Sequence, residues 1–302
     1  MKNTLLYSLT AGLALGLATA HASLEIEEQF DYTAGDLAGN GTGTTGLAGN
    51  WTSPVVGPGK GDWEVMASGL SFTDHLSDAG GSAERNAASG SDYAQVEISA
   101  AAQTNLLADG STAYFSFLVG FPGGNAETFD NHTFYIGTND TPDSAADPVT
   151  TTGGSGFGFA IDGANGNNGP RPLRAFTMDN GSSTLSAGDI GDVPDESSPT
   201  QLIVGQLDWV ANGGNDTLTL WNVADPTIGL GTNSVSMTAD LDQSLFDTLT
   251  IASKQNNVVF DEIRFGTTLG DVSTVAVPEP SSYALLAGMF GLTLVMLRRR
   301  QG

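Results

Sequence analysis

Short runs of alternating apolar and polar residues, separated by glycine-rich turns, constrain the fold of this chain most strongly. Within residues 113–121 every second side chain is apolar, so Phe115, Phe117 and Val119 fall on one face of a predicted strand. Comparable runs occupy 25–32, 63–66, 69–73, 93–99, 133–137, 156–162, 173–178, 202–209, 217–221, 248–251 and 258–265. No window of the body shows a helical stripe. This pattern predicts an all-β fold in which two antiparallel sheets close as a sandwich or barrel.

A clear turn signal separates the predicted strands 202–209 and 217–221. The sequence Asn-Gly-Gly-Asn at 212–215 favours a hairpin, because glycine and asparagine accept positive φ angles. Leu218 and Leu220 would then face the core. No Pro/Ser-rich linker and no internal repeat divides the body before about residue 272, so we expect a single domain.

The charge of the chain limits its partners. It contains 34 Asp and Glu but only 10 Lys and Arg, for a formal net charge of −24. An acidic surface repels the phosphate backbone and anionic lipids, so we expect no nucleic-acid partner. The same surface attracts divalent cations. Because the chain has no cysteine, no disulfide can stabilise it, and core burial has to do so.

The first 22 residues have the features of a secretory signal peptide. Lys2 supplies a positive charge, residues 5–18 form an apolar core, and Ala20 and Ala22 form a small-x-small cleavage site. We therefore predict that segment 1–22 directs export across the inner membrane and is then removed.

Residues 273–302 combine an extended hinge, a short apolar stretch and a basic cluster. The segment contains Pro278, Glu279 and Pro280, then the apolar residues 283–297, then Arg298, Arg299 and Arg300. Two prolines cannot continue a helix or a central strand. The 15 apolar residues are fewer than the ~20 that a full membrane span requires. Three arginines favour the cytoplasmic side. An ordinary C-terminal anchor is one interpretation.

The order of these three parts resembles the PEP-CTERM sorting signal of Gram-negative bacteria. The resemblance implies that a membrane enzyme, exosortase, recognises Pro278, Glu279 and Pro280 and processes the tail. It also implies a transient association with the inner membrane, and a destination at the cell surface or in the extracellular polysaccharide matrix.

Three short motifs resemble concanavalin A-like (laminin G-type) jelly rolls. They lie at 28–37 with 49–51, at 214–221, and at 260–268. The resemblance implies that residues 23–272 form two curved antiparallel sheets with the first and last strands paired. It also implies, by analogy of fold, an exported module that contacts extracellular polysaccharide.

No catalytic residue can be assigned from the sequence. The glutamates do not start the Glu-x-Asp-x-x-Glu pattern of the jelly-roll glucanases, and Glu25 and Glu27 on one strand face are typical of solvated edge charge. His75 and His132 are isolated and typical of solvated loop residues. A non-catalytic module is therefore the main prediction. A glycoside hydrolase or polysaccharide lyase with dispersed carboxylates is the alternative.

Asp261 is the one candidate metal ligand. Strict alternation places its carboxylate on the same face as Ile263 and Phe265, where a buried charge needs hydrogen-bond donors or a cation. The jelly-roll resemblance implies a structural calcium ion bound by an aspartate at this place. A bulge that turns Asp261 outward, or a carboxylate capped by backbone N–H groups, is the alternative.

Two tryptophans are candidate glycan contacts. Trp209 and Trp221 flank the predicted hairpin near the strand ends, where an exposed ring could stack on a sugar. Tryptophan within a strand is more commonly a core residue.

Overall fold

The computed structural model describes residues 23–53, 63–75, 80–85, 91–120, 131–143, 149–162, 171–193, 200–211, 213–254 and 258–274. The cleavage site at Ala20 and Ala22 and the whole sorting signal, from Pro278 to Arg300, lie outside these residues. Within these ranges no helix has the length and apolar character needed to cross a membrane.

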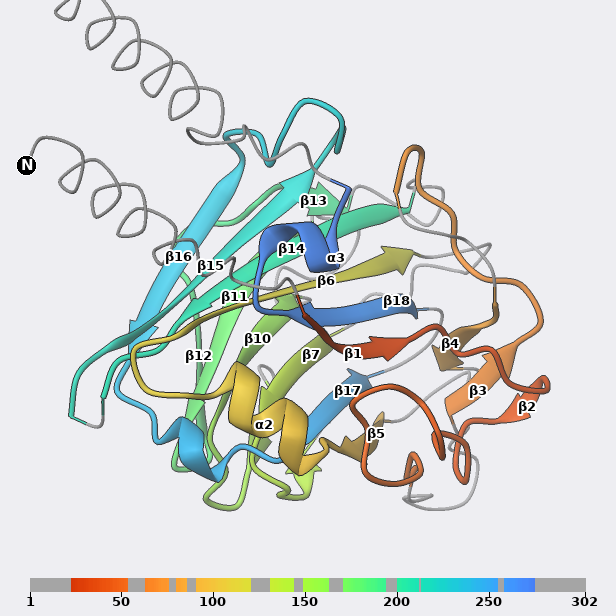
Figure 1. Ribbon diagram of the computed structural model, residues 1–302, viewed down its shortest axis with the longest axis horizontal. Coiled ribbons are helices and arrows are strands. Elements are labelled where there is room, and N and C mark those ends of the chain that lie inside the picture. Colours follow the sequence, from red (N-terminus) through yellow and green to blue (C-terminus); the bar gives the residue numbers. More distant parts are fainter. Residues whose placement is uncertain are drawn as a thin grey trace, which may run out of the picture.

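Two antiparallel sheets, one behind the other, make up the body (Figure 1). The nine-stranded sheet has the order β16 (Ser234–Ala239), β15 (Asp216–Val223), β14 (Gln201–Asp208), β6 (Thr112–Gly120), β18 (Val259–Gly266), β4 (Ser82–Arg85), β3 (Trp63–Met66) and β2 (Gly35–Asp36), with β1 (Leu24–Glu28) also paired to β18. The seven-stranded sheet has the order β12 (Ser182–Leu185), β11 (Arg171–Asp179), β10 (Gly156–Ile161), β7 (Asn131–Gly137), β17 (Thr248–Lys254) and β5 (Ser91–Glu97), with β13 (Asp192–Val193) paired to β11.

Smaller elements connect and cover the sheets. A hairpin of β8 (Pro142–Asp143) and β9 (Thr150–Thr151) follows β7. The helices within the described ranges are α2 (Ala100–Leu106), the 3-10 turn η1 (Gln243–Leu245) and α3 (Leu269–Val272). α3 packs on β6 and β18, where the Ser116 hydroxyl donates to the Val272 carbonyl.

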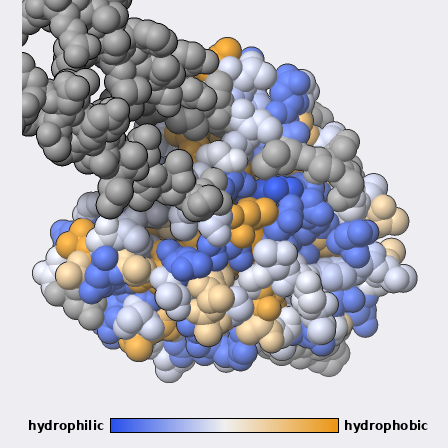
Figure 2. Space-filling model, in the orientation of Figure 1, coloured by the Kyte–Doolittle hydropathy of each residue, from blue (hydrophilic) through white to orange (hydrophobic). Residues whose placement is uncertain are grey.

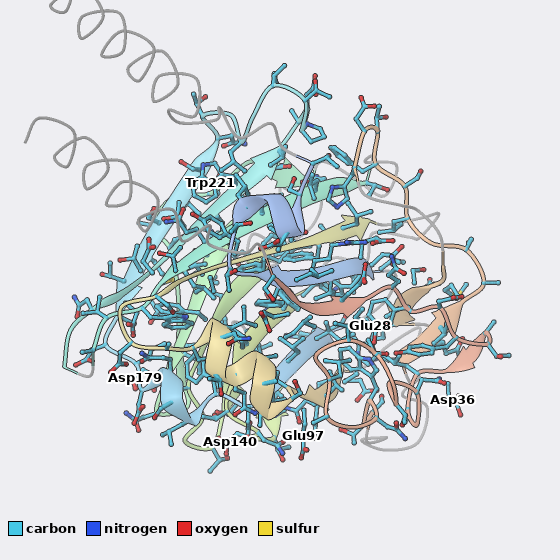
Figure 3. The ribbon with its side chains drawn as sticks, viewed as in Figure 1. Glu28, Asp36, Glu97, Asp140, Asp179 and Trp221 are labelled. Carbon is cyan, nitrogen blue, oxygen red and sulfur yellow. The ribbon has the colours of Figure 1, made fainter. Side chains whose placement is uncertain are left out.

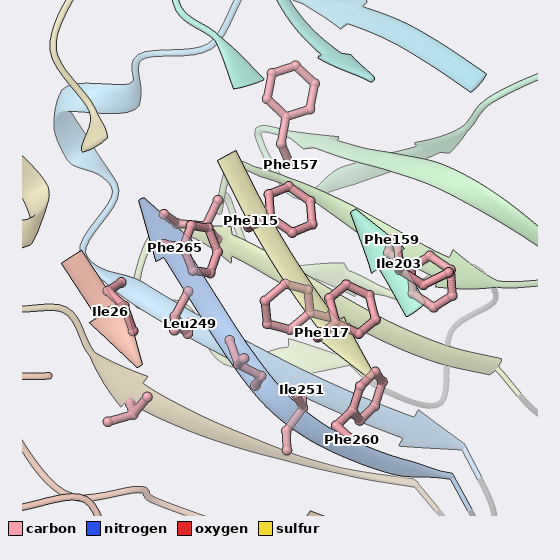
Figure 4. Packing of buried hydrophobic residues seen from close by; sticks show 14 of the residues in the cluster. Ile26, Phe115, Phe117, Phe157, Phe159, Ile203, Leu249, Ile251, Phe260 and Phe265 are labelled. Atoms are coloured by element: carbon pink, nitrogen blue, oxygen red, sulfur yellow. The ribbon is translucent and has the colours of Figure 1, made fainter. Parts of the chain in front are cut away.

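Phenylalanine rings fill the space between the two sheets. Phe115 and Phe117 on β6, both labelled in Figure 4, meet Phe134 on β7 with ring centroids 6.0 and 4.7 Å apart, respectively. Gly205 on β14 allows this packing, because a Cβ there would lie 2.1 Å from the Phe115 ring. Burying such rings supplies the apolar area that a chain without disulfides needs.

The structure confirms the expected all-β, two-sheet antiparallel jelly-roll sandwich. As expected, the first and last strands pair: β1 lies antiparallel to β18. The hairpin around 212–215 joins β14 to β15, and Leu218 and Leu220 are buried in the core.

The strand predicted at 69–73 is wrong. This segment crosses the outer side of the nine-stranded sheet, where Leu70 packs on an apolar cluster and its N–H bonds to a side chain rather than to a neighbouring strand. Strands β4, β12 and β16 were not predicted, because their short Ser- and Thr-containing sequences resemble turns.

Candidate functional site

The outer side of β15 and β16 exposes polar residues around one aromatic ring. Leu218 and Leu220 face the core, so Thr219 and Trp221 point outward. Trp221 is partly buried against an apolar cluster on the same outer side. We define the open face as the outward residues of β6, β14, β15 and β16: Tyr114, Gln206, Asp208, Thr217, Thr219, Trp221, Ser234, Ser236 and Thr238.

Cross-strand register arranges the open face in polar rows. One row runs from Ser236 through Thr219 and Gln206 to Tyr114. Within it, the Thr219 and Ser236 hydroxyls lie 2.8 Å apart. Neighbouring strands are about 4.8 Å apart, so Tyr114 and Thr219, two strands away from each other, lie roughly 10 Å apart. A row of this length offers hydroxyl and amide groups to an extended chain of polar rings.

Asp208 lies in the next row of the open face and is held in place by its neighbours. Its Oδ1 accepts from the Thr112 hydroxyl at 2.7 Å, and the Gln206 amide donates to both carboxylate oxygens at 3.0 and 2.8 Å. Burial first, and then the charge of Asp208, raise the pKa of the Tyr114 hydroxyl. The open face therefore holds a carboxylate in a fixed position.

Of the two predicted glycan contacts, only Trp221 belongs to the open face. Trp209 is 2% exposed, packs between Phe157 and Phe246, and donates from Nε1 to the Leu106 carbonyl at 2.7 Å. The indole thus bonds the last residue of α2, and its ring fills the core. The interpretation of Trp209 as a glycan contact is wrong. Figure 3 shows Trp221 well away from Glu28 on the same sheet.

The outer side of the seven-stranded sheet is covered. We define the covered face by eight of its outward residues, each at most 7% exposed: Tyr93, Gln95, Thr133, Tyr135, Ala160, Phe176, Met178 and Ala252. Val149, which precedes β9, packs on Tyr93 and Ala252. The Gln95 amide donates to the Asp140 carbonyl at 2.9 Å. The segment that carries β8 and β9 therefore lies over this sheet.

The two histidines do not form a catalytic group. His132 is fully buried, with Nδ1 2.9 Å from the Ser253 hydroxyl, so the prediction of a solvated loop residue is wrong for it. His75 is partly buried on the other sheet, where burial, and then the charge of Arg264, lower its pKa to about 4.

A bulge in β18 changes the expected position of Asp261. The register with β6 shifts between Asp261 and Arg264, and Glu262 takes a positive φ of 50°. Ile263 and Phe265 face the core, whereas Asp261 lies opposite Leu118, which belongs to the outer apolar cluster. The expectation that Asp261 shares the face of Ile263 and Phe265 is therefore wrong, and the bulge alternative is confirmed.

Asp261 nevertheless remains a buried carboxylate, 1% exposed. Its oxygens accept from the backbone N–H groups of Leu70 and Glu262, both at 2.7 Å. Desolvation by burial raises the pKa of Asp261 to about 8 despite these bonds. The buried Glu28 accepts three bonds, from the Phe30 N–H, the Tyr32 hydroxyl and the Trp51 indole, and burial, foremost, raises its pKa as well.

Oxygen atoms converge beside Asp261. A Cβ on Gly69 would lie 2.7 Å from Asp261 Oδ2, 3.1 Å from the Gly81 carbonyl and 3.3 Å from the Gly80 carbonyl. One carboxylate with backbone carbonyls is a donor set that fits calcium. No group of three or more His, Cys, Asp or Glu side chains that could hold a metal occurs in the described part of the chain.

Glu27 and Glu262 approach each other through Arg264. Arg264 Nη2 lies 2.8 Å from Glu27 Oε1 and 3.2 Å from Glu262 Oε2, so these two oxygens are at most 2.8 + 3.2 = 6.0 Å apart. Burial, foremost, raises the pKa of Glu262. Sequence reasoning missed this pair, because only the pairing of β1 with β18 brings them together.

Comparisons with known proteins give a distant likeness in fold alone. No family model and no curated protein matches the sequence. A carbohydrate esterase from Shiga toxin-encoding bacteriophage phi24B aligns at 10% identity over 82% of this chain and 99% of that chain, with a TM-score of 0.43. An alginate lyase from Chlorella virus aligns at 8% identity over 78% and 99%, with a TM-score of 0.42. Lectin II from Ulex europaeus aligns at 12% identity over 82% and 100%, with a TM-score of 0.41. Scores this low say nothing of what this chain binds.

Proposed function

We propose that this protein is an exported, non-catalytic β-sandwich module of the cell surface or exopolysaccharide matrix that contacts glycan through the open face. The observation that carries the proposal is the row of hydroxyl and amide side chains beside Trp221 on an exposed sheet surface. Sugars are bound by aromatic rings that stack on them and by polar groups at fixed positions. The covered face lacks such access in the residues that the structure describes.

Pull-down of the full-length protein in mild detergent on insoluble polysaccharides tests this function. We expect retention on at least one matrix polysaccharide and loss of retention in Trp221→Ala. A protein that no polysaccharide retains, with and without calcium, would leave only an adhesive or structural role.

Export and sorting form the second part of the proposal. The signal peptide 1–22 and the PEP-CTERM-like tail support delivery through the inner membrane and processing by exosortase. In a host with exosortase, the mature protein should lack residues 283–302 and leave the inner membrane; in a host without it, the protein should stay membrane-bound. Intact-mass analysis decides between processing and an ordinary anchor, since an unprocessed protein would retain Arg298, Arg299 and Arg300.

Calcium beside Asp261 is the third part of the proposal. The Asp261 carboxylate and the Gly80 and Gly81 carbonyls would hold the ion, which would neutralise a buried charge and tie β18 to the segment that crosses it. A chelator should then lower the melting temperature of the wild type, and Asp261→Asn should remove that difference. A melt that neither chelator nor added calcium shifts would exclude the site.

A glycosidase is the alternative function, favoured by the Glu27–Glu262 pair alone. Their oxygen separation of at most 6.0 Å is compatible with the ~5–5.5 Å of retaining enzymes. Release of reducing sugar that both Glu27→Gln and Glu262→Gln abolish would establish hydrolysis. Because both carboxylates are paired to Arg264, we expect no release.

A further inference from the structure

The open face is built from parts of the chain that contain no cation. Between Arg85 and Arg171, and again between Arg174 and Lys254, there is no lysine or arginine. The first interval contains β6 and the second contains β14, β15 and β16. Residues 175–253 alone hold 11 aspartates and glutamates. The residues that define the open face therefore include one carboxylate, that of Asp208, and no cation.

The Arg and Lys side chains that the structure describes are buried, paired with a carboxylate, or located in the other sheet. Arg85 is fully buried, Arg174 is paired with Asp162 at 3.2 Å, and Arg264 is paired with Glu27. Lys254 lies at the end of β17, in the other sheet. On the face of the molecule seen in Figure 2, apolar residues are scattered in small patches among hydrophilic ones.

From this charge distribution we infer that the glycan contacted by the open face is a polysaccharide with free amino sugars, bound through a protonated amine at Asp208 beside Tyr114, while another part of the polymer reaches Trp221 two rows away. This inference rests on the proposed function. Asp208 is partly exposed, and its two oxygens are fixed by Gln206 and Thr112. An ammonium group gains from a fixed carboxylate and from an adjacent aromatic ring, here that of Tyr114, which lies on β6 diagonally across from Asp208.

The same charges disfavour the other common class of matrix polysaccharide. A uronate or sulfate polymer would approach a surface of its own sign, and like charges suppress association. A neutral glycan would gain only the stacking and hydroxyl contacts. The expected order of affinity is therefore amino sugar, then neutral sugar, then uronate.

Calorimetric titration of the full-length protein with matched hexasaccharides tests the inference. The ligands are a glucosamine hexamer, its N-acetylated form and an alginate hexamer, each at low salt, at high salt and with calcium. We expect the glucosamine hexamer to bind at least tenfold more tightly than the acetylated one, and added salt to reduce this difference.

Two variant pairs separate a local contact from general charge attraction. Asp208→Asn should lose most of the preference, whereas Asp36→Asn, an exposed aspartate on β2, removes the same charge elsewhere and should stay within twofold of wild type. If Asp208→Asn does not fold, Ser236→Lys on the exposed part of β16 should lose binding, with Ser182→Lys on β12 as its control.

The outcomes distinguish the inference from the proposed function. Equal affinity for the amino and acetylated hexamers, or an equal loss in Asp208→Asn and Asp36→Asn, would overturn the inference and leave glycan contact standing. Calcium-dependent binding of the alginate hexamer alone would also overturn it. Binding of no saccharide at all would overturn both.

Discussion

The open face and the covered face are the outer sides of two similar antiparallel sheets, yet they have opposite relations to solvent. On the covered face Tyr135 and Phe176 pack with ring centroids 5.8 Å apart and are fully buried. On the open face Ser236 is exposed and Trp221 only partly buried. The comparison teaches that alternation identifies a strand but not which of its faces meets solvent, since a distant loop decides that.

The largest expected effect is on the stability of the covered face. Phe176→Ala removes a fully buried ring and should lower the free energy of unfolding by about 3–5 kcal/mol. Trp221→Ala should cost clearly less, because that ring is only partly buried. Urea unfolding measures both variants. Equal losses would mean that the open face is as closed as the covered one.

Asp261 lies in the part of the nine-stranded sheet that the segment around Leu70 covers, and the pH dependence of stability tests its burial. Its folded pKa of about 8 lies above the ordinary 3.8, so the folded state binds the proton more tightly than the unfolded state. In chelator, stability contributed by this group should be full below pH 4 and decline as the pH rises to 8, by at most about 1.4 kcal/mol per pH unit. Asp261→Asn should flatten this decline, and added calcium should reverse it in the wild type. A wild-type profile in chelator that matches Asp261→Asn would contradict this account.

The smallest expected effect concerns the Tyr135 hydroxyl. It is buried, and its contact with the Thr250 side chain does not reach normal hydrogen-bond geometry. Replacing it by Phe should therefore change the free energy of unfolding by less than about 1 kcal/mol, or stabilise the protein slightly. Thermal unfolding of Tyr135→Phe checks this, with Tyr114→Phe on the open face as the matched control. A loss of several kcal/mol would show that the hydroxyl has an essential partner.

The fold was predictable because it depends on local pattern, whereas the open face was not. Alternation placed Phe115, Phe117 and Leu218 correctly in the core. The Asn-Gly-Gly-Asn turn fixed the pairing of β14 with β15. Alternation also separates the two tryptophans, because Trp209 continues the core face of Leu207 whereas Trp221 follows the core residue Leu220 and so points outward.

The bulge in β18 and the row from Ser236 to Tyr114 had no usable signal in the sequence. A single extra residue reverses the faces of Asp261 and its neighbours without altering the apolar pattern. Likewise, only the register with β6 and β15 shows that Gln206 and Asp208 belong to rows of polar side chains. Long-range pairing carries this information, and a single sequence does not display it.

The affinity of the Trp221→Ala variant for a polysaccharide that the wild type binds tests the central claim most directly. Titration of wild type, Trp221→Ala and Leu245→Ala with the same soluble ligand provides the comparison, since Leu245 is 60% exposed on η1 and is not one of the open-face residues. We expect at least a tenfold loss of affinity for Trp221→Ala and no change for Leu245→Ala. Wild-type affinity in Trp221→Ala would contradict the assignment of glycan contact to the open face.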